Sequence, residues 1–209
     1  MVGGAPPMRP LGWLVAAAAL GCSGRATPEI AGDLTGAVLP IAAPRPSFVL
    51  TTTAGAPYDF RERTRGRLTL LFFGYTHCPD VCPATMANLG SVVGRLSSAE
   101  RALVDVVFVT TDPARDPAAV LGPWLAAFEP GILGLLGTAE AVRQAQVAAG
   151  IAVAVRDSGR SAYTVSHAAQ VLVYSPDDSA HVAYPFGTRQ AQWAADLPKL
   201  FERWKGAVR

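Results

Sequence analysis

The sequence predicts an α/β domain in which a mixed central sheet is covered by helices on both faces. Two nearly continuous apolar runs, residues 67–73 and 103–110, are typical of strands that are buried on both sides. A helical pattern over residues 83–96 separates these two runs, and further helical patterns follow. Alternation of strands and helices along a chain favours a sheet with helices packed on it.

Three central helices are supported by their own start signals. The helix over residues 83–96 begins with a proline in its first turn, where no amide donor is needed. A second helix is expected over residues 117–128, with Asp116 as its cap. A third is expected over residues 138–149, capped by Thr138.

The C-terminal part predicts a hairpin followed by a helix. Residues 169–174 and 181–184 read as two strands around a turn at residues 175–178. The last helix covers about residues 188–204, and its apolar residues recur at helical spacing as a stripe that packs on the sheet. That stripe consists of Trp193, Leu197, Leu200, Phe201 and Trp204. The whole order of elements fits a thioredoxin-like arrangement.

Length and composition limit the classes of function. With 209 residues, half of them apolar, the chain can bury one ordinary core, so we expect one folded domain. Lysine and arginine total 18 against 16 acidic residues. Such a balance provides no strong electrostatic field, so we expect no nucleic-acid partner.

The N-terminus predicts export and a lipid anchor. The apolar run at residues 11–20 is about half the roughly 20 residues that a membrane-spanning helix needs, so residues 1–21 read as a signal peptide. Cys22 follows Ala-Leu-Gly, a pattern similar to the lipobox of bacterial lipoproteins. An ordinary cleaved signal and an uncleaved short anchor are the alternatives. We therefore expect lipidation of Cys22 at a bacterial cell membrane, with the domain facing the extracytoplasmic space or periplasm.

The folded domain is expected to begin near residue 47. Residues 22–46 contain several prolines and glycines and show no sustained helical or strand period, so they predict a tether. Residues 47–209 are then the thioredoxin-like domain.

Cys78 and Cys82 form the pair with the clearest chemical meaning. They lie between the carboxyl end of the strand at 67–73 and the helix at 83–96. Helix-terminal amides stabilise thiolates, so we expect lowered thiol pKa values. If the turn between the cysteines is helical, both thiols fall on one face and can share a metal or form a redox disulfide.

The spacing of the cysteines favours a metal site. Redox enzymes of this fold usually place two residues between their cysteines, whereas three intervene here. Thiolates select Cu(I), zinc and iron–sulfur clusters, and two sulfurs with one imidazole would suit three-coordinate Cu(I). The chain has three histidines. His77 adjoins Cys78, but adjacent side chains on a loop tend to point in different directions. We expect His181 to be a surface residue. His167, which precedes the strand at 169–174, is the better candidate.

Three linked motifs resemble the Sco/SenC family of copper chaperones for cytochrome c oxidase. They are FFGYTHCPDVCP (72–83), TTDPARDP (110–117) and YTVSHAAQVLVY (163–174). The resemblance implies a thioredoxin-like copper-binding domain with Cys78, Cys82 and His167 as copper ligands. It implies Cu(I), with Cu(II) as a further candidate.

The chain departs from the family pattern at two positions. Ser166 stands where the family usually has an acid, so a carboxylate that orients the imidazole would have to come from elsewhere. Ala114 stands where a glutamate is usual. Asp112 is retained, either as part of a local turn or as a group near the copper.

Two further functions compete with copper delivery. The resemblance implies a chaperone without substrate turnover, with the copper-bearing subunit of cytochrome c oxidase as partner and with a separate copper donor. A thiol-disulfide reductase that keeps the copper-binding cysteines of the oxidase reduced would use Cys78 and Cys82, and this activity can accompany copper delivery. A peroxiredoxin-type peroxidase would need no histidine ligand, so His167 in its motif argues against it.

Overall fold

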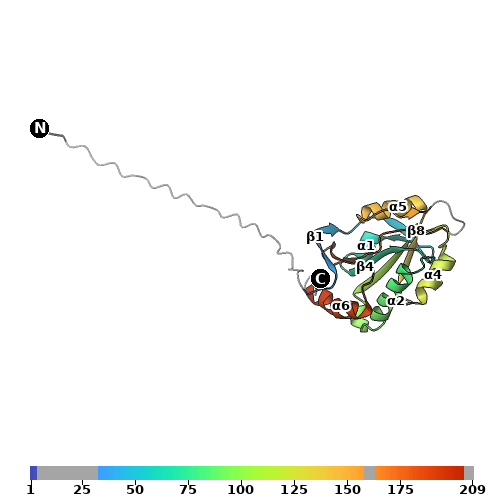
Figure 1. Ribbon diagram of the computed structural model, residues 1–209. Coiled ribbons are helices and arrows are strands. Elements are labelled where there is room, and N and C mark those ends of the chain that lie inside the picture. Colours follow the sequence, from blue (N-terminus) through green and yellow to red (C-terminus); the bar gives the residue numbers. More distant parts are fainter. Residues whose placement is uncertain (4–32, 158–162, 205–209) are drawn as a thin grey trace.

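The computed structural model describes residues 1–3, 33–157 and 163–204 (Figure 1). Of the predicted signal peptide, residues 1–3 are described, and Cys22 lies outside the described residues. In the described part of the chain, no helix has the length and apolar character that crossing a membrane requires.

A mixed sheet of eight strands forms the centre of the described domain, in the order β1-β10-β9-β4-β5-β6-β2-β3. Its strands are β1 (Ala37–Pro44), β2 (Val49–Thr52), β3 (Pro57–Asp59), β4 (Leu68–Gly74), β5 (Val104–Thr110), β6 (Leu133–Leu136), β9 (Val171–Tyr174) and β10 (Ser179–Tyr184). A separate small ribbon pairs β7 (Val155–Arg156) with β8 (Val165–Ser166). Strands β4, β5 and β6 are parallel, and the other pairings are antiparallel.

Helices cover both faces of the sheet, as the sequence predicts (Figure 1). They are α1 (Phe60–Thr64), α2 (Val81–Val93), α3 (Ser98–Arg101), α4 (Ala118–Ala126), α5 (Ala139–Ala148) and α6 (Gln190–Trp204). Side chains along β4 alternate between two buried clusters: Leu70 and Phe72 pack with α2, α4 and α6, whereas Leu71 and Phe73 pack with α1 and α5. Both faces of β4 are therefore buried, which explains its continuous apolar run.

The N-terminal boundary differs from the prediction. Residues 37–44, which the sequence assigned to a tether, form β1 and pair with β10 at the edge of the sheet. Arg45, also in the predicted tether, is only 1% exposed. The tether prediction is wrong for these residues. β1 lies at the edge of the sheet and its side chains are mostly exposed, so they show no alternation of buried and exposed positions from which a strand could be predicted.

The predicted helices are present, with one wrong cap. Thr138 caps α5, since its side chain accepts a hydrogen bond from the amide of Ala141. Asp116 does not cap α4. Its carboxylate instead accepts hydrogen bonds from the amide of Thr76 and the hydroxyl of Thr110, so these donors on β5 and the β4–α2 loop replace the helix amides.

The parallel register brings two functional segments to one end of the sheet. Gly74, the last residue of β4, lies beside Thr110, the last residue of β5. The segment after Gly74 carries the two cysteines, and the segment after Thr110 carries Asp112. Ligands in α/β sheets commonly bind at the carboxyl ends of strands, so this end of the sheet is where a site is expected.

Candidate metal centre

The cysteines lie in and just after the connection between β4 and α2. Cys78 belongs to the loop, where its amide donates to the carbonyl of Tyr75 at 3.2 Å. Cys82 is the second residue of α2. Both thiols are free and buried, with Cys78 8% and Cys82 0% exposed.

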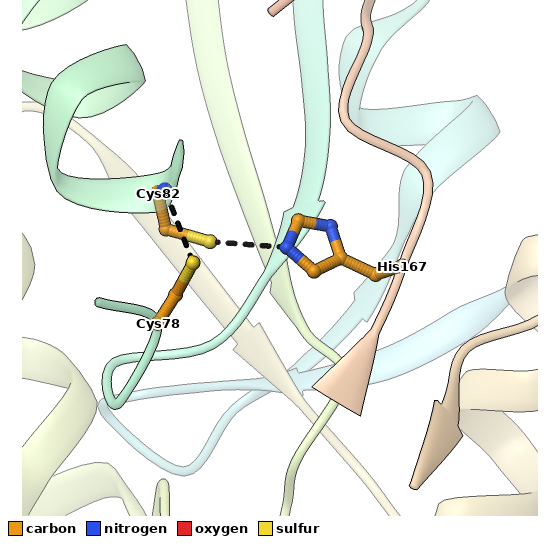
Figure 2. Close-up of side chains that lie close together, drawn as sticks. All are labelled: Cys78, Cys82 and His167. Carbon is orange, nitrogen blue, oxygen red and sulfur yellow. Dashed lines mark hydrogen bonds between the residues drawn. The ribbon is translucent and has the colours of Figure 1, made fainter. Parts of the chain in front are cut away.

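His167 completes a group of three metal-binding side chains. It follows β8, and its Nε2 atom lies 3.4 Å from the Sγ atom of Cys82. Figure 2 shows the three side chains pointing toward one another from the loop, from α2 and from the segment after β8. Their ligand atoms all lie within 4.8 Å of one another. The structure therefore brings together the three residues that the sequence predicts as ligands.

Backbone amides approach both sulfurs. The amide of Tyr75 donates to Sγ of Cys82, and the amide of Cys82 donates to Sγ of Cys78, each at 3.5 Å. Such donors stabilise negative charge on sulfur. These hydrogen bonds orient the two thiols in the metal-free protein.

Gly74 leaves room for the sulfur of Cys82. A Cβ atom built on Gly74 would lie 2.7 Å from that sulfur and 2.8 Å from the ring of Phe72. Any other residue here would push the thiol or the ring away. The glycine at the end of β4 is therefore a requirement of the site's packing.

Burial changes the expected acidity of one thiol. The complete burial of Cys82 raises the pKa of its thiol far above the usual value, and the amide of Tyr75 opposes this only in part. The expectation of a lowered pKa is wrong for Cys82, because loss of water outweighs the amide donors at the start of the helix. A cation placed between the sulfurs would supply the missing compensation for a thiolate.

The imidazole of His167 is held in a form that can bind metal. Its Nδ1 atom lies 2.9 Å from the carbonyl oxygen of Ala168, which can only accept, so Nδ1 carries the hydrogen. The lone pair of Nε2 then faces Cys82. Burial lowers the pKa of His167, which keeps the ring neutral. The rings of Phe72 and Tyr75 contact it edge-on, with centroids 5.9 and 5.7 Å away.

The other two histidines lie apart from this group. His77 is half exposed, and its Nδ1 atom lies 3.0 Å from the hydroxyl of Thr76. His181 is only 6% exposed, so the prediction of a surface residue is wrong. It pairs with Asp177 at 2.8 Å and its ring stacks on Trp204, which explains why an imidazole is buried there.

Asp112 reaches the metal-binding group only through intermediates. One carboxylate oxygen accepts a 2.9 Å hydrogen bond from the hydroxyl of Tyr163, and the other accepts from Nε of Arg115. Arg115 also donates to the carbonyl oxygen of Tyr163 at 3.0 Å. Asp112 thus fixes the strand segment that leads through β8 to His167, and it makes no contact with the three donors.

Tyr75 is a site residue that sequence reasoning missed. Its amide holds the sulfur of Cys82, its ring contacts His167, and its hydroxyl accepts from the amide of Val165 at 3.3 Å. It therefore joins the cysteine loop to β8. Its position within the GYTHC segment was the available signal, but an aromatic residue beside a strand end is usually read as core.

The donor set fits a soft monovalent metal. Two sulfurs and one imidazole nitrogen converge in surroundings formed by aromatic and aliphatic side chains. Thiolate and imidazole are ligands that Cu(I) prefers, and no carboxylate belongs to the group. The described residues therefore offer a site suited to copper.

Comparison with known proteins places the chain in a family. The SCO1/SenC family model matches residues 40–202. A Stutzerimonas stutzeri protein, named as a candidate copper-binding protein, is 32% identical over 142 residues, which cover 67% of this chain and 69% of that protein. Alignments with mitochondrial SCO proteins span less than half of those relatives' lengths.

Solved structures agree with this placement. Apo Sco1 from Thermus thermophilus is 33% identical, with a TM-score of 0.71 over 80% of this chain and 96% of that one. ScoI from Bradyrhizobium japonicum, solved with copper bound, is 28% identical, with a TM-score of 0.66 over 76% of this chain and 99% of that one. The chain therefore belongs to the SCO1/SenC family and has its thioredoxin-like fold.

Proposed function

We propose that this chain is a copper chaperone. It binds one Cu(I) through Cys78, Cys82 and His167 and delivers the ion to the copper-bearing subunit of cytochrome c oxidase during assembly. The observation that carries the proposal is the convergence of three soft or borderline donors within 4.8 Å at the carboxyl end of β4.

The chemistry of the donors and the relatives supports copper as the cargo. Cu(I) accepts two thiolates and one imidazole without further ligands, whereas structural zinc sites are four-coordinate. A related ScoI structure contains copper, and a relative that aligns over two thirds of this chain is named for copper binding. Membership of the SCO1/SenC family supports the oxidase as the proposed recipient.

The burial of the ligands is unequal, and this suits transfer. Cys82 is fully buried, Cys78 is 8% exposed, and His167 is half-buried. An acceptor can therefore replace His167 and Cys78 first while Cys82 still holds the ion. Stepwise ligand exchange of this kind releases a tightly held metal without exposing it as a free ion.

An anaerobic titration of the reduced full chain with Cu(I), read by X-ray absorption, tests the proposal. We expect one Cu(I) per chain, with two sulfur ligands and one nitrogen ligand. Zinc(II) provides the comparison, because a site built for Cu(I) should bind zinc more weakly. Absence of Cu(I) uptake by fully reduced protein would refute the proposal.

Thiol-disulfide reduction is the second candidate. In that reaction Cys78 and Cys82 form a disulfide, and two electrons and two protons pass to a disulfide of the partner. Both thiols are free, and their sulfur atoms lie within 4.8 Å of each other. Since burial raises the pKa of Cys82, Cys78 would be the attacking thiol. A His167→Ala variant separates the roles, because a thiol reductase should be nearly indifferent to it.

The proposed location is the outer face of a bacterial cell membrane. Lipid on Cys22 would hold the domain in the extracytoplasmic space or periplasm, where an oxidase subunit and a copper donor could both reach it. The support for this anchor is the sequence pattern around Cys22.

A further inference from the structure

A cavity lies beside the segment that leads to His167. Its volume is about 520 Å³, within the size range of ligand-binding pockets. Among the described residues, three segments line it: the β5–α4 loop with Asp112 and Ala114, one face of α5 with Arg143, and the β7–β8 ribbon with Arg156 and Val165. None of the three metal-binding residues lines it, so it is a separate site.

Two arginines stack on one tyrosine at the wall of this cavity. The guanidinium carbons of Arg115 and Arg156 lie 3.6 and 3.5 Å from the ring centre of Tyr163. At such short distances two guanidinium groups cannot share one face of a ring, so they occupy opposite faces. Stacking leaves the edge of each guanidinium group free to donate hydrogen bonds in the plane of the fork.

The carboxylates near the cavity do not neutralise all of these cations. Asp112 pairs with Arg115, and Glu140 pairs with Arg143. Arg156 is exposed and has no ion pair among the residues that the structure describes. Among the described residues that line the cavity, Arg156 is therefore the cation without an ion pair.

A second donor is also unused. The Nη2 atom of Arg115 is buried and has no hydrogen-bond partner within the described part of the chain. Buried donors in native structures nearly always have partners, so an unpaired guanidinium nitrogen indicates a missing acceptor. Arg115 already donates through Nε to Asp112 and through Nη1 to the carbonyl oxygen of Tyr163, and it does not line the cavity. The guanidinium fork that a carboxylate can match at the cavity is therefore that of Arg156.

The cavity is coupled to the metal centre by one short strand. Val165 lines the cavity, and its amide donates to the hydroxyl of Tyr75, whose ring contacts His167. His167 itself follows β8 directly. A protein that takes copper from His167 and Cys78 would lie over this end of the sheet, close to the β8 residues that line the cavity.

We propose that this cavity docks a carboxylate-bearing segment of the protein that accepts copper, with Arg156 pairing with the incoming carboxylate. The inference rests on the proposed function, because the acceptor is the protein that copper delivery requires. A single exposed ion pair contributes little by itself. The carboxylate therefore has to arrive on a partner that also engages the metal centre, which favours a protein segment over a free small acid.

The test measures association between the reduced, Cu(I)-bound full chain and the copper-bearing domain of the oxidase subunit from the same organism. Isothermal titration at low and at physiological salt compares wild type with Arg156→Gln. We expect an affinity loss of about fivefold to tenfold and a weaker salt dependence, while Cu(I) uptake stays unchanged. Arg156→Lys should recover part of the affinity, because lysine keeps the positive charge but lacks the paired hydrogen-bond donors of the guanidinium group.

Arg61→Gln is the matched control. It removes one exposed arginine from α1, which precedes β4 and so lies at the opposite end of the sheet from the metal centre. Ala114→Glu is a second probe: it places a carboxylate in the lining, where it should occupy Arg156 and weaken docking as Arg156→Gln does. Both variants should retain Cu(I) uptake.

The outcomes separate the two proposals. Equal acceptor affinities for Arg156→Gln and Arg61→Gln, or no association of the acceptor with wild type, would overturn the docking site while leaving Cu(I) binding intact. Tight binding of free glutarate by wild type, with acceptor affinity unchanged by Arg156→Gln, would also overturn it. Failure of wild type to take up Cu(I) would instead refute the chaperone function.

Discussion

The hydroxyl of Tyr163 donates a 2.9 Å hydrogen bond to the buried carboxylate of Asp112, and this bond joins two loops that meet at the metal centre. Asp112 follows β5, whereas Tyr163 precedes β8 and His167. The residue before His167 is Ser166, which has no carboxylate to offer. The carboxylate that supports the histidine segment therefore comes from the loop after β5 and acts through Tyr163.

Removing this support should weaken the metal site. We expect Asp112→Ala to lower Cu(I) affinity by about tenfold, since partners that orient a ligand typically contribute 10- to 100-fold. The loss arises because the segment before His167 becomes free to move. Competition titration against a chromophoric Cu(I) chelator measures the change.

Tyr163→Phe provides the control, because it removes only the hydroxyl that Asp112 accepts from. If Asp112 acts through Tyr163, the double variant should lose little more affinity than Asp112→Ala alone. Fully additive losses would show that Asp112 supports the site by another route.

The three proposed ligands should differ in their contributions. Cys78→Ser and Cys82→Ser should abolish tight Cu(I) binding, because affinity for this soft ion depends mainly on thiolate. His167→Ala should weaken binding less, since the two sulfurs remain. Oxidation that joins Cys78 to Cys82 should also abolish binding, because the disulfide removes both sulfur donors. Wild-type affinity in either cysteine variant would show that the site has been assigned wrongly.

The core strands and the position of the two cysteines could be predicted because their signals are local. β4 is buried on both faces, so its apolar run is continuous, and the cysteines follow it directly. β1 could not be predicted in this way. It is an edge strand with prolines at two positions and no alternation of buried and exposed residues. Its partner, β10, lies far away in the sequence.

Three wrong expectations share a physical cause. Asp116 was expected to cap a helix, but threonine donors from neighbouring segments satisfy its carboxylate instead. His181 was expected on the surface, but Asp177 and Trp204 provide a buried environment for it. The thiol of Cys82 was expected to be acidic, but its burial raises the pKa. In each case, tertiary surroundings outweigh a local rule.

The N-terminal anchor can be tested separately from the metal centre. We expect the mature chain to begin with Cys22 carrying lipid, because the apolar run at residues 11–20 is long enough for a signal peptide but too short to span a bilayer. Mass spectrometry of protein purified from membranes measures this. An intact Met1, or cleavage after Cys22, would contradict lipidation and leave the copper proposal unaffected.

Tyr58 should make the apoprotein less stable in alkali. Burial, followed by the charge of Asp105, raises the pKa of Tyr58 to about 12, whereas a tyrosine in the unfolded chain ionises near about 10. Above that lower value the unfolded state releases a proton that the folded state keeps, so stability falls as pH rises from about 10 toward 12.

Denaturant unfolding of wild type and Tyr58→Phe at several pH values between about 9 and 12 tests this expectation. Phenylalanine cannot ionise, so the variant should lose stability less steeply across that window. Equal slopes for the two proteins would show that Tyr58 titrates alike in both states.

β1 and Arg45 should be essential parts of the domain, although the sequence placed both in a tether. Arg45 is buried, and its guanidinium group donates to Asp178 at 2.9 Å and to the carbonyl oxygens of Arg67 and Ser175 at 3.0 and 2.8 Å. It also donates to the hydroxyls of two buried threonines, Thr64 and Thr69. One side chain therefore joins β1 to the start of β4 and to the hairpin turn.

Arg45→Met should lower the free energy of unfolding by about 3–5 kcal/mol, because the substitution leaves Asp178 and several buried acceptors without their donor.

A chain that begins at residue 47 should be destabilised further, since it also lacks β1 and exposes the edge of β10. Urea unfolding of the full chain, of Arg45→Met and of the two chains that begin at residues 33 and 47 makes the comparison. Arg61→Gln, an exposed substitution on α1, should stay within about 0.5 kcal/mol of wild type. Equal stability of the chains that begin at 33 and 47 would mean that β1 adds nothing to the fold and that the tether prediction holds.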